Sequence, residues 1–390
     1  MARFAIISEY NPLHAGHAYH LESARRAGAD TVTCIMSGNF TQRGEPAIAH
    51  KYTRAYAALV TGSDLVVELP FPYAAGSAEI FAAAGVSLAD TTGADTLFFG
   101  SECGDVEHLM AVASTVNSEE FKHNYQRLIK TNIGNSAAYA KAYEVTTGQP
   151  FPSLSNDLLG VAYCKAILRG EYELKPLCIK REGAAYRDTA LTEGYPSATA
   201  LRKLLKNKGI DALLPHMPVT VFEVLADAFD RGEMLDLGHA YDIALLCALR
   251  MQSKEQIEAA ALCGGGLGAR IWQAAREATN IATLMQACAH KSLPDSHVRR
   301  ALLYAAIGVR ESDLHAPPAY LSVLAANNRG RALLSELRRT CPISIITKPA
   351  DAPECRQRAL TDRADALYTL AMSAPRSAGF FTKHSPIVQD

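Results

Sequence analysis

The chain has 390 residues, 48% of them hydrophobic and 20% charged, which is enough for two or three domains with sizeable cores. Its 39 basic and 40 acidic side chains leave a formal net charge of −1, so nucleic-acid binding would need a local basic patch. No apolar run approaches the roughly 20 residues that cross a bilayer, and the nine cysteines form no Cys-x-x-Cys pair, so we expect a cytoplasmic protein with reduced thiols and no membrane contact.

In residues 1–205, short apolar runs alternate with helical patterns. The predicted strands are Phe4–Ile7, Asp30–Met36, Asp64–Leu69, Asp95–Phe99 and Leu174–Arg181. The predicted helices are His17–Ala27, Lys51–Thr61, Ala74–Asp90, an excursion over residues 104–145, Asn156–Arg169 and Ala200–Leu205. Uninterrupted apolar strands between helices indicate a parallel, Rossmann-like sheet covered on both faces, with ligands bound beyond the carboxyl ends of its strands.

The pattern changes after about residue 206. Amphipathic helical stretches dominate there, and one strand-like run stands out at Ile343–Thr347. We therefore predict an α/β fold with a parallel-sheet domain over residues 1–205, followed by a mainly helical domain over residues 206–390.

The first predicted strand leads into His14-Ala15-Gly16-His17 at a helix start, with His20 three residues further on. A helix amino terminus carries unpaired N–H groups and a partial positive charge, so it attracts phosphate. Gly16 lets the backbone approach a ligand closely, and imidazole N–H groups could stabilise charge that develops on a triphosphate. The competing interpretation, three surface or metal-binding histidines, is less favoured because no carboxylate cluster lies nearby in the sequence.

The His-x-Gly-His pattern after a first strand, with Ser-x-x-x-x-Arg opening a late helix, resembles the HxGH nucleotidyltransferase superfamily of adenylyltransferases and class I aminoacyl-tRNA synthetases. Seven segments in order narrow this to a resemblance to the tRNA(Met) cytidine acetate ligase family. These segments are SEYNPLHAGHAYHL, MSGNFTQRGEPAI, DLVVELPFPYA, FFGSE, SNDLLGVAY, KREGAAYRD and SATALRK. They fall within residues 4–205, and a weaker likeness continues in HVRRALLYAAIGV and LAANNRGRALL. Any one segment would be a weak signal, but seven in order are highly specific.

The resemblance implies an ATP-dependent ligase that activates free acetate and uses no acetyl-CoA. Acetate would attack the α-phosphate of ATP, pyrophosphate would leave, and N4 of the wobble cytidine of elongator tRNA(Met) would take the acetyl group from acetyl-adenylate. The products would be N4-acetylcytidine and AMP. The triphosphate implies Mg²⁺, although the sequence shows no dedicated metal site, and we predict no protein partner.

The resemblance also implies which residues bind ATP, with His14 and His17 as the catalytic pair at the phosphates. The implied ATP-binding residues are Ile7, Ser8, Glu9, Tyr10, Asn11, Pro12, Leu13, His14, Ala15, Gly16, His17, Ala18, Tyr19, His20, Gly100, Asn156, Arg181, Ser197 and Thr199. On sequence alone, Arg181 would be taken for a surface arginine. Ser197 and Thr199 would be taken for residues that simply cap a helix. Asp157 departs from the Asn-Asn pair often found in the family, and its charge puts an ATP contact at that position in doubt.

The loop after the second strand holds Gln42 and Arg43, which we expect to close over the acetate or the cytidine. Arg43 could pair with the acetate carboxylate, and a salt-bridged surface turn is an equally good interpretation of the sequence. Two locally basic stretches could contact tRNA phosphates, unless they are solvated helix faces. Their candidate RNA-binding residues are Lys203, Lys206, Arg329, Arg331, Arg338 and Arg339.

Two other functions fit parts of this pattern. A small-molecule adenylyltransferase would need only the first domain, so the long helical second domain argues against it. A non-enzymatic RNA-binding protein on a decayed nucleotide fold is disfavoured because His14, Gly16 and His17 are intact. The three functions differ in their use of ATP. The ligase should need acetate and tRNA, the adenylyltransferase should need neither, and the RNA-binding protein should not turn over ATP.

Overall fold

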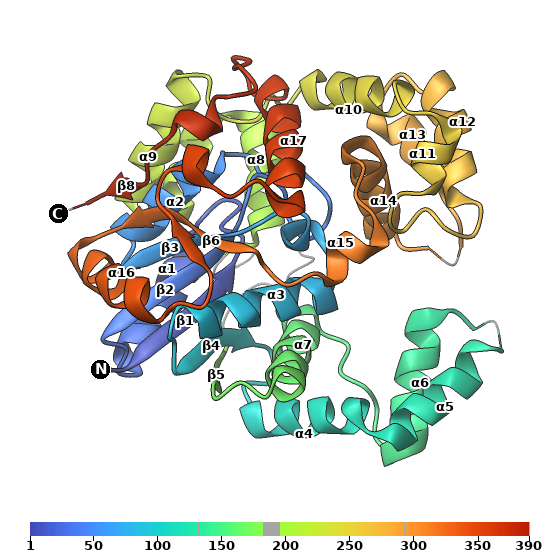
Figure 1. Cartoon of the computed structure of the whole chain (residues 1–390), viewed down its shortest axis with the longest axis horizontal. Helices are drawn as coiled ribbons and strands as arrows, with labels where there is room; N and C mark the ends of the chain where they lie inside the picture. Colours follow the sequence, from blue (N-terminus) through green and yellow to red (C-terminus); the bar gives the residue numbers. More distant parts are fainter. Residues whose placement is uncertain (132, 182–195, 292, 390) are drawn as a thin grey trace.

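A mixed sheet lies in the left half of the molecule in Figure 1, with helices α10–α14 to its right. The computed structural model describes residues 1–131, 133–181, 196–291 and 293–389. The strands are β1 (Arg3–Ser8), β2 (Thr31–Ser37), β3 (Leu65–Leu69), β4 (Thr96–Ser101), β5 (Lys175–Lys180), β6 (Tyr320–Ala326), β7 (Ser344–Ile346) and β8 (Ile387–Val388). Their order across the sheet is β5-β4-β1-β2-β3-β6-β7, and β8 pairs with β6. Because β1–β5 are parallel, their carboxyl ends lie at one edge of the sheet, here called the carboxyl edge.

The parallel sheet predicted for residues 1–205 is confirmed, and the chain beyond residue 206 adds three more strands. β6 pairs antiparallel with β3, with Leu65 opposite Ala326, so β6 ends at the opposite edge, the amino edge. Its sequence YLSVLAA is not among the predicted strands because serine and alanine dilute the β-branched signal, yet β6 is buried along its whole length. The division into domains at residue 205 stays a prediction, since the sheet draws strands from both sides of it.

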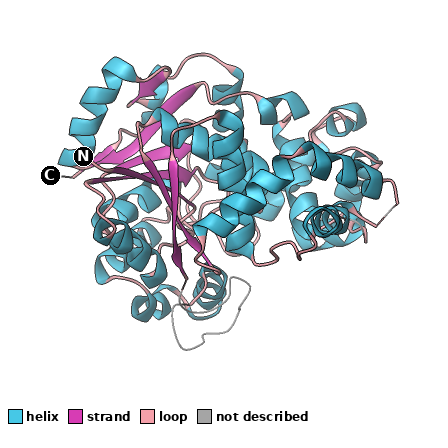
Figure 2. Ribbon diagram, turned by 90° about the horizontal axis from the view of Figure 1, so that it is seen from below, coloured by secondary structure: helices cyan, strands magenta, loops and turns pink. Residues whose placement is uncertain are grey.

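Helices cover both faces of the sheet (Figure 2). They are α1 (Ala15–Arg26), α2 (Lys51–Val60), α3 (Ala78–Thr91), α4 (Val106–Asn117), α5 (Glu119–Ile129), α6 (Asn135–Thr147), α7 (Ser155–Gly170), α8 (Ala198–Lys208), α9 (Val219–Asp230), α10 (Ala240–Arg250), α11 (Lys254–Glu258), α12 (Leu267–Glu277), α13 (Ile281–Cys288), α14 (Asp295–Ile307), α15 (Glu311–His315), α16 (Asn328–Thr340) and α17 (Arg356–Leu370). Side chains alternate along β2: Cys34 and Met36 belong to the core on the side of α1 and α2, whereas Ile35 belongs to the core on the side of α3. No helix in the described part of the chain is long and apolar enough to span a membrane.

The predicted helix Ala74–Asp90 is divided in the structure. A 3-10 turn spans Tyr73–Ala75, and α3 begins only after Ser77, whose hydroxyl accepts a hydrogen bond from the Ile80 N–H. The break falls at Gly76, where a Cβ would come within 2.6 Å of the Ile80 side chain. The prediction was wrong here because the alanine-rich pattern hid the serine cap that starts the helix.

Two distant parts of the chain enclose the carboxyl edge. In α14, the Tyr304 hydroxyl donates to the carbonyl oxygen of Ala75 at 2.9 Å, just beyond β3. In α17, the Tyr368 hydroxyl donates to the carbonyl oxygen of Ala47 at 2.8 Å, in the loop beyond β2. Helices α14 and α17 therefore cover the loops after β3 and β2, at the edge of the sheet where the sequence predicts ligand binding.

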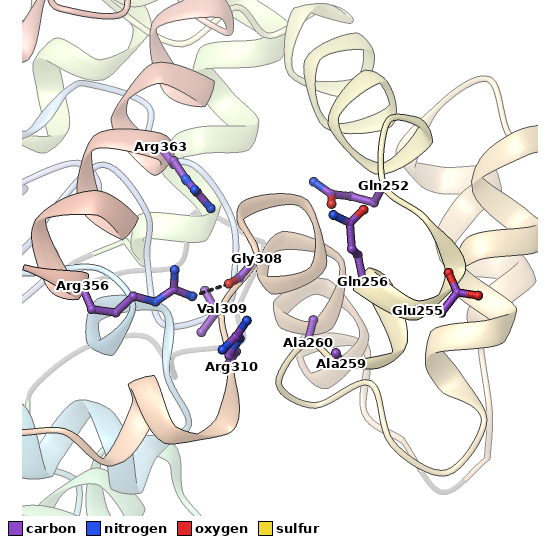
Figure 3. A pocket seen from close by; sticks show the side chains of 10 residues that line it. All are labelled: Gln252, Glu255, Gln256, Ala259, Ala260, Gly308, Val309, Arg310, Arg356 and Arg363. Carbon is purple, nitrogen blue, oxygen red and sulfur yellow. Dashed lines mark hydrogen bonds between the residues drawn. The ribbon is translucent and has the colours of Figure 1, made fainter.

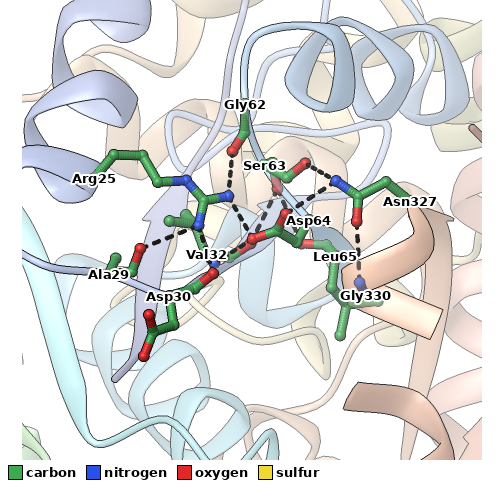
Figure 4. A network of polar contacts seen from close by, with 10 residues as sticks. All are labelled: Arg25, Ala29, Asp30, Val32, Gly62, Ser63, Asp64, Leu65, Asn327 and Gly330. Atoms are coloured by element: carbon green, nitrogen blue, oxygen red, sulfur yellow. Dashed lines mark hydrogen bonds and ion pairs between the residues drawn. The ribbon is translucent and has the colours of Figure 1, made fainter. Parts of the chain in front are cut away.

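A polar network holds α16 at the amino edge (Figure 4). The Asp64 carboxylate, just before β3, forms an ion pair with Arg25 and accepts a hydrogen bond from the Val32 N–H at 2.8 Å. It also accepts from Asn327 Nδ2 at 2.9 Å, and Asn327 caps α16. Gly330 in α16 lies so close to β3 that a Cβ would stand 2.0 Å from the Asp64 carbonyl oxygen. This close approach fixes the start of α16 at the edge opposite the carboxyl edge.

Candidate active site

The turn from β1 into α1 gathers three imidazoles at the carboxyl edge. His14 is the N-cap of α1, and its Nδ1 accepts a hydrogen bond from the Gly16 N–H at 3.1 Å. The ring centroids of His14 and His17 are 3.9 Å apart, with 32° between the ring planes. His20 lies deeper, stacked on Phe98 of β4 at 5.0 Å. The structure thus pairs His14 with His17, whereas His20 packs into the core.

Burial keeps these three histidines neutral. It lowers the pKa of His14 to about 3, and the charge of Arg181 adds to the effect. The same two causes lower the pKa of His20 to about 4. Burial also holds the pKa of His17 well below its ordinary value, with further contributions from His14 and Arg181. Nδ1 of His17 is buried without a hydrogen-bond partner among the described residues, which suits it to a ligand at this turn.

Arg181 follows β5 directly and lies over the end of β4. Its N–H donates to the Ser101 carbonyl oxygen at 2.8 Å, and a Cβ at Gly100 would come within 3.1 Å of the Arg181 Cγ. The glycine therefore leaves the space that the arginine side chain occupies. Two residues predicted from separate strands are thus brought together beside the histidines. A cation next to neutral N–H donors suits a polyanionic ligand.

Asn156 and Asp157 begin α7 and exchange hydrogen bonds with the turn after β4. The Glu102 carboxylate accepts from Asn156 Nδ2 at 2.6 Å and from the Asp157 N–H at 2.8 Å. In return, Asp157 Oδ1 accepts from the N–H groups of Glu102 at 2.9 Å and Cys103 at 3.1 Å, and from the Ser101 hydroxyl. The charge of Asp157 is therefore engaged inside the protein, where it holds the turn that follows β4.

Ser197 and Thr199 lie at the start of α8. The Ser197 hydroxyl accepts from the Ala200 N–H at 3.1 Å, so the simple capping role is present. Arg202 donates to Thr199 Oγ1 at 3.2 Å and to the Asn11 carbonyl oxygen at 2.8 Å. Arg202 thereby holds the amino terminus of α8 beside the histidine turn.

The loop after β2 is held against the same turn. The Gln42 N–H donates to Glu9 Oε1 at 2.8 Å. Burial raises the pKa of Glu9, and the Gln42 hydrogen bond and the charges of Arg202, Arg54 and Arg43 oppose that rise. Gln42 and Arg43 therefore lie beside the end of β1, and their role toward acetate or cytidine stays a prediction.

Arg54 of α2 joins the segments at this edge, and sequence reasoning missed it. The side chain is 1% exposed and donates to the carbonyl oxygens of Ala49 at 2.8 Å, Glu9 at 2.6 Å and Gly38. Because its planar fork reaches the segments after both β1 and β2, it sets the spacing between them. The available signal was a single arginine in the alanine-rich stretch KYTRAYAALV.

Lys51, a second buried cation, was also missed. Its Nζ contacts the carboxylates of Glu68 at 2.9 Å and Asp365 at 2.7 Å, and Asp365 also accepts from Asn39 Nδ2 at 2.8 Å. Burial opposes the charge of Lys51, but Asp365 and Glu68 outweigh it and raise the pKa of the lysine. Because Lys51 and Asp365 are 314 residues apart, no local pattern could have revealed this pair.

The predicted RNA-binding residues lie on different sides of the molecule. Lys203 and Lys206 are exposed on α8, the helix beside the histidine turn. The four predicted arginines of α16 are also exposed, but α16 begins at the amino edge. The structure therefore does not gather the α16 arginines with the histidines.

Known protein families and curated relatives match this sequence over most of its length. A profile described as HIGH Nucleotidyl Transferase matches residues 1–380. The tRNA(Met) cytidine acetate ligase of Caldanaerobacter subterraneus subsp. tengcongensis is 36% identical over 367 residues, which cover 90% of this chain and 89% of that protein. The protein of the same name from Halothermothrix orenii is 33% identical over 369 residues, with 89% and 87% covered.

Solved structures agree with these relatives. Apo Thermotoga maritima TmcAL matches with a TM-score of 0.92 at 29% identity, covering 100% of this chain and 99% of that one. The same protein bound with alpha-thio ATP matches with a TM-score of 0.90 at 28% identity over 100% of both chains. The predicted nucleotidyltransferase fold and the resemblance drawn from seven short segments are therefore confirmed. The chain belongs to the tRNA(Met) cytidine acetate ligase family.

Proposed function

We propose that this protein is an ATP-dependent ligase that joins acetate to N4 of the wobble cytidine of elongator tRNA(Met). The observation that carries the proposal is the pair of buried, neutral imidazoles of His14 and His17 at the start of α1, with Arg181 beside them. Relatives named tRNA(Met) cytidine acetate ligase, and a solved relative bound with alpha-thio ATP, support these substrates. The proposal includes a cytoplasmic location, where acetate, ATP and tRNA are all available.

In the first step, an acetate oxygen attacks the α-phosphorus of ATP and pyrophosphate leaves. Negative charge grows on the phosphate oxygens, so donors placed in advance lower the barrier. His14 uses Nδ1 as an acceptor, which leaves its proton on Nε2 as a donor to phosphate. Arg181 supplies the positive charge, and the start of α8 at Ser197 and Thr199 receives the leaving phosphates.

Mg²⁺ belongs to this proposal as an ion carried by the triphosphate. In the part of the chain that the structure describes, no three side chains of His, Cys, Asp or Glu converge on one point. Phosphate oxygens and water commonly supply most ligands of Mg²⁺ in such sites. Free acetate is the acyl source, and the reaction has no need of acetyl-CoA.

In the second step, N4 of the cytidine attacks the acetyl carbonyl, and AMP leaves. The base must leave its stack before N4 can reach the carbonyl. Gln42 and Arg43 lie beside Glu9 at the turn, where they can border the acetyl group. We assign Arg43 to the acetate carboxylate, so an Arg43→Ala enzyme should show a higher KM for acetate. An unchanged acetate dependence would refute that role.

The proposal is tested by acetate-dependent exchange of labelled pyrophosphate into ATP, first without and then with elongator tRNA(Met). We expect exchange in the wild type to require acetate, and His17→Ala to lower its rate by about 10²–10³-fold. His123→Ala removes an exposed histidine of α5 and is the matched control. Nucleoside analysis should then find N4-acetylcytidine in elongator but not initiator tRNA(Met). Exchange without acetate, or none with tRNA present, would contradict the proposal.

A further inference from the structure

Arg300 of α14 is seated on the loop that carries Gln42 and Arg43. Its Nη1 donates to the Gln42 carbonyl oxygen at 3.3 Å. Gly44, with a φ of 74°, packs so closely on α14 that a Cβ there would lie 2.8 Å from the backbone nitrogen of Arg300. The helix therefore presents Arg300 directly to the loop beside the histidine turn.

The guanidinium of Arg300 has no acidic partner among the described residues, unlike that of its neighbour. Arg299 forms an ion pair with Glu45 of the same loop, the salt bridge expected of a surface turn. Arg300 is half-buried, and its Nε is buried without a hydrogen-bond partner in the described part of the chain. Burial lowers the pKa of Arg300, and only the Tyr304 hydroxyl opposes that shift. A partly desolvated cation of this kind is stabilised when an anion binds to it.

At the carboxyl end of α14, two arginines of α17 donate hydrogen bonds to carbonyl groups of the helix (Figure 3). Beside a cavity of about 410 Å³, Arg356 donates to the Gly308 carbonyl oxygen at 2.6 Å and Arg363 to that of Ile307 at 3.2 Å. Basic side chains commonly stabilise the last carbonyl groups of a helix in this way. Arg300 lies far from the carboxyl terminus of α14 and has no such role.

Positive charge exceeds negative charge around the loop. Arg202, Arg54 and Arg43 all act on the carboxylate of Glu9, Arg299 pairs with Glu45, and Arg300 adds a further cation. Such a surplus favours an anionic ligand supplied from outside the protein.

The position of Arg300 indicates which anion this is. Gln42 links Glu9 to Arg300, since its N–H donates to Glu9 and its carbonyl oxygen accepts from Arg300, so Arg300 lies beside the β1–α1 turn that would hold the nucleotide and not within it. Phosphates that flank an unstacked base lie at the mouth of a site, and most contacts to nucleic acid are made with the backbone. We propose that Arg300 binds a backbone phosphate next to the wobble cytidine. This inference rests on the proposed function.

The test compares full-length wild type, Arg300→Gln, Arg300→Lys and Arg127→Gln for binding of an elongator tRNA(Met) transcript over a range of salt concentrations. Arg127 is exposed on α5, away from the sheet, and controls for loss of one positive charge. We expect Arg300→Gln to bind about tenfold more weakly and to lower the slope of log Kd against log salt by about 1. Acetate-dependent exchange without tRNA should keep the wild-type KM for acetate, which also shows that the variant is folded.

Arg300→Lys keeps the charge but loses the fork, so it should bind more weakly at an unchanged salt slope. An affinity and slope of Arg300→Gln equal to those of Arg127→Gln would overturn the inference. A raised KM for acetate with unchanged tRNA binding would also overturn it and would assign Arg300 to the acetate. If Arg300→Gln failed to fold, wild-type affinity in Arg300→Lys would decide against the inference. A wild type without acetate-dependent exchange would instead refute the proposed function itself.

Discussion

Replacing Asp365 with alanine should break the buried network that holds α17 to the sheet. Asp365 contributes one oxygen to Lys51 Nζ at 2.7 Å and the other to Asn39 Nδ2 at 2.8 Å. The Lys51 side chain is 5% exposed and that of Asp365 is 9% exposed, so water cannot readily replace the lost partner. Lys51 keeps its contacts with Glu68 at 2.9 and 3.0 Å, which limits the damage.

Two terms set the size of the effect. Losing a hydrogen bond to a charged group costs about 1.5–3 kcal/mol, and leaving the amide of Asn39 unpaired costs about 1–3 kcal/mol. The sum agrees with the roughly 3–5 kcal/mol that breaking a buried ion pair costs when one partner is removed. We therefore expect Asp365→Ala to lower the free energy of unfolding by about 3–5 kcal/mol.

Urea unfolding followed by circular dichroism measures this loss as a shift of the midpoint. Asp362→Ala, one turn earlier on α17, is the matched control because its 47% exposed carboxylate faces Arg358 at 3.6 Å. Exposed pairs of this kind contribute about 0–1 kcal/mol. Equal midpoints for the two variants would show that the Lys51 network does not hold α17 in place.

Three further predictions test other features. His14, with a folded pKa of about 3, binds its proton far more weakly than when unfolded, so this histidine alone should contribute about 2 kcal/mol to the stability lost between pH 7 and 5. His17 and His20 add to that loss, so His14→Asn should reduce it by about 2 kcal/mol in denaturant titrations at each pH. Gly330→Ala should cost about 1–3 kcal/mol because of its clash with β3, whereas Gly264→Ala, in open space, should change the thermal midpoint little. Asp157→Asn should leave the KM for ATP within about twofold of wild type, because this carboxylate is engaged by backbone N–H groups. The loss of a contact worth about 1.4 kcal/mol would instead raise the KM tenfold. A large rise in that KM would place Asp157 at the nucleotide after all.

Local patterns were enough to predict the parallel strands in the first half of the molecule. The runs FAII, VTCIM, LVVEL and LFF are buried on both faces, so their strands could be predicted without knowledge of their neighbours. The His14–His17 turn was recognisable because strand, turn and helix start are contiguous in the chain. Gly100 and Arg181 could be named only through the family resemblance, and the structure shows that they are adjacent.

Tertiary structure alone decided what surrounds that turn. β6 joins the sheet through its pairing with β3, and its alanines and serine gave no local signal of this. Because β6 runs antiparallel to β3, α16 begins at the amino edge of the sheet. The arginines of α16 that were predicted to bind RNA therefore do not lie with the histidine turn at the carboxyl edge.

The charges of the site depend on distant contacts in the same way. The sequence by itself determined the parallel strands β1–β5 and the turn from β1 into α1, because those depend on neighbouring residues. It could not determine that His14 is buried and neutral, that Lys51 meets Asp365 or that Arg300 faces Gln42. These properties arise from burial and from contacts between residues far apart in the chain, which exist only once the chain has folded.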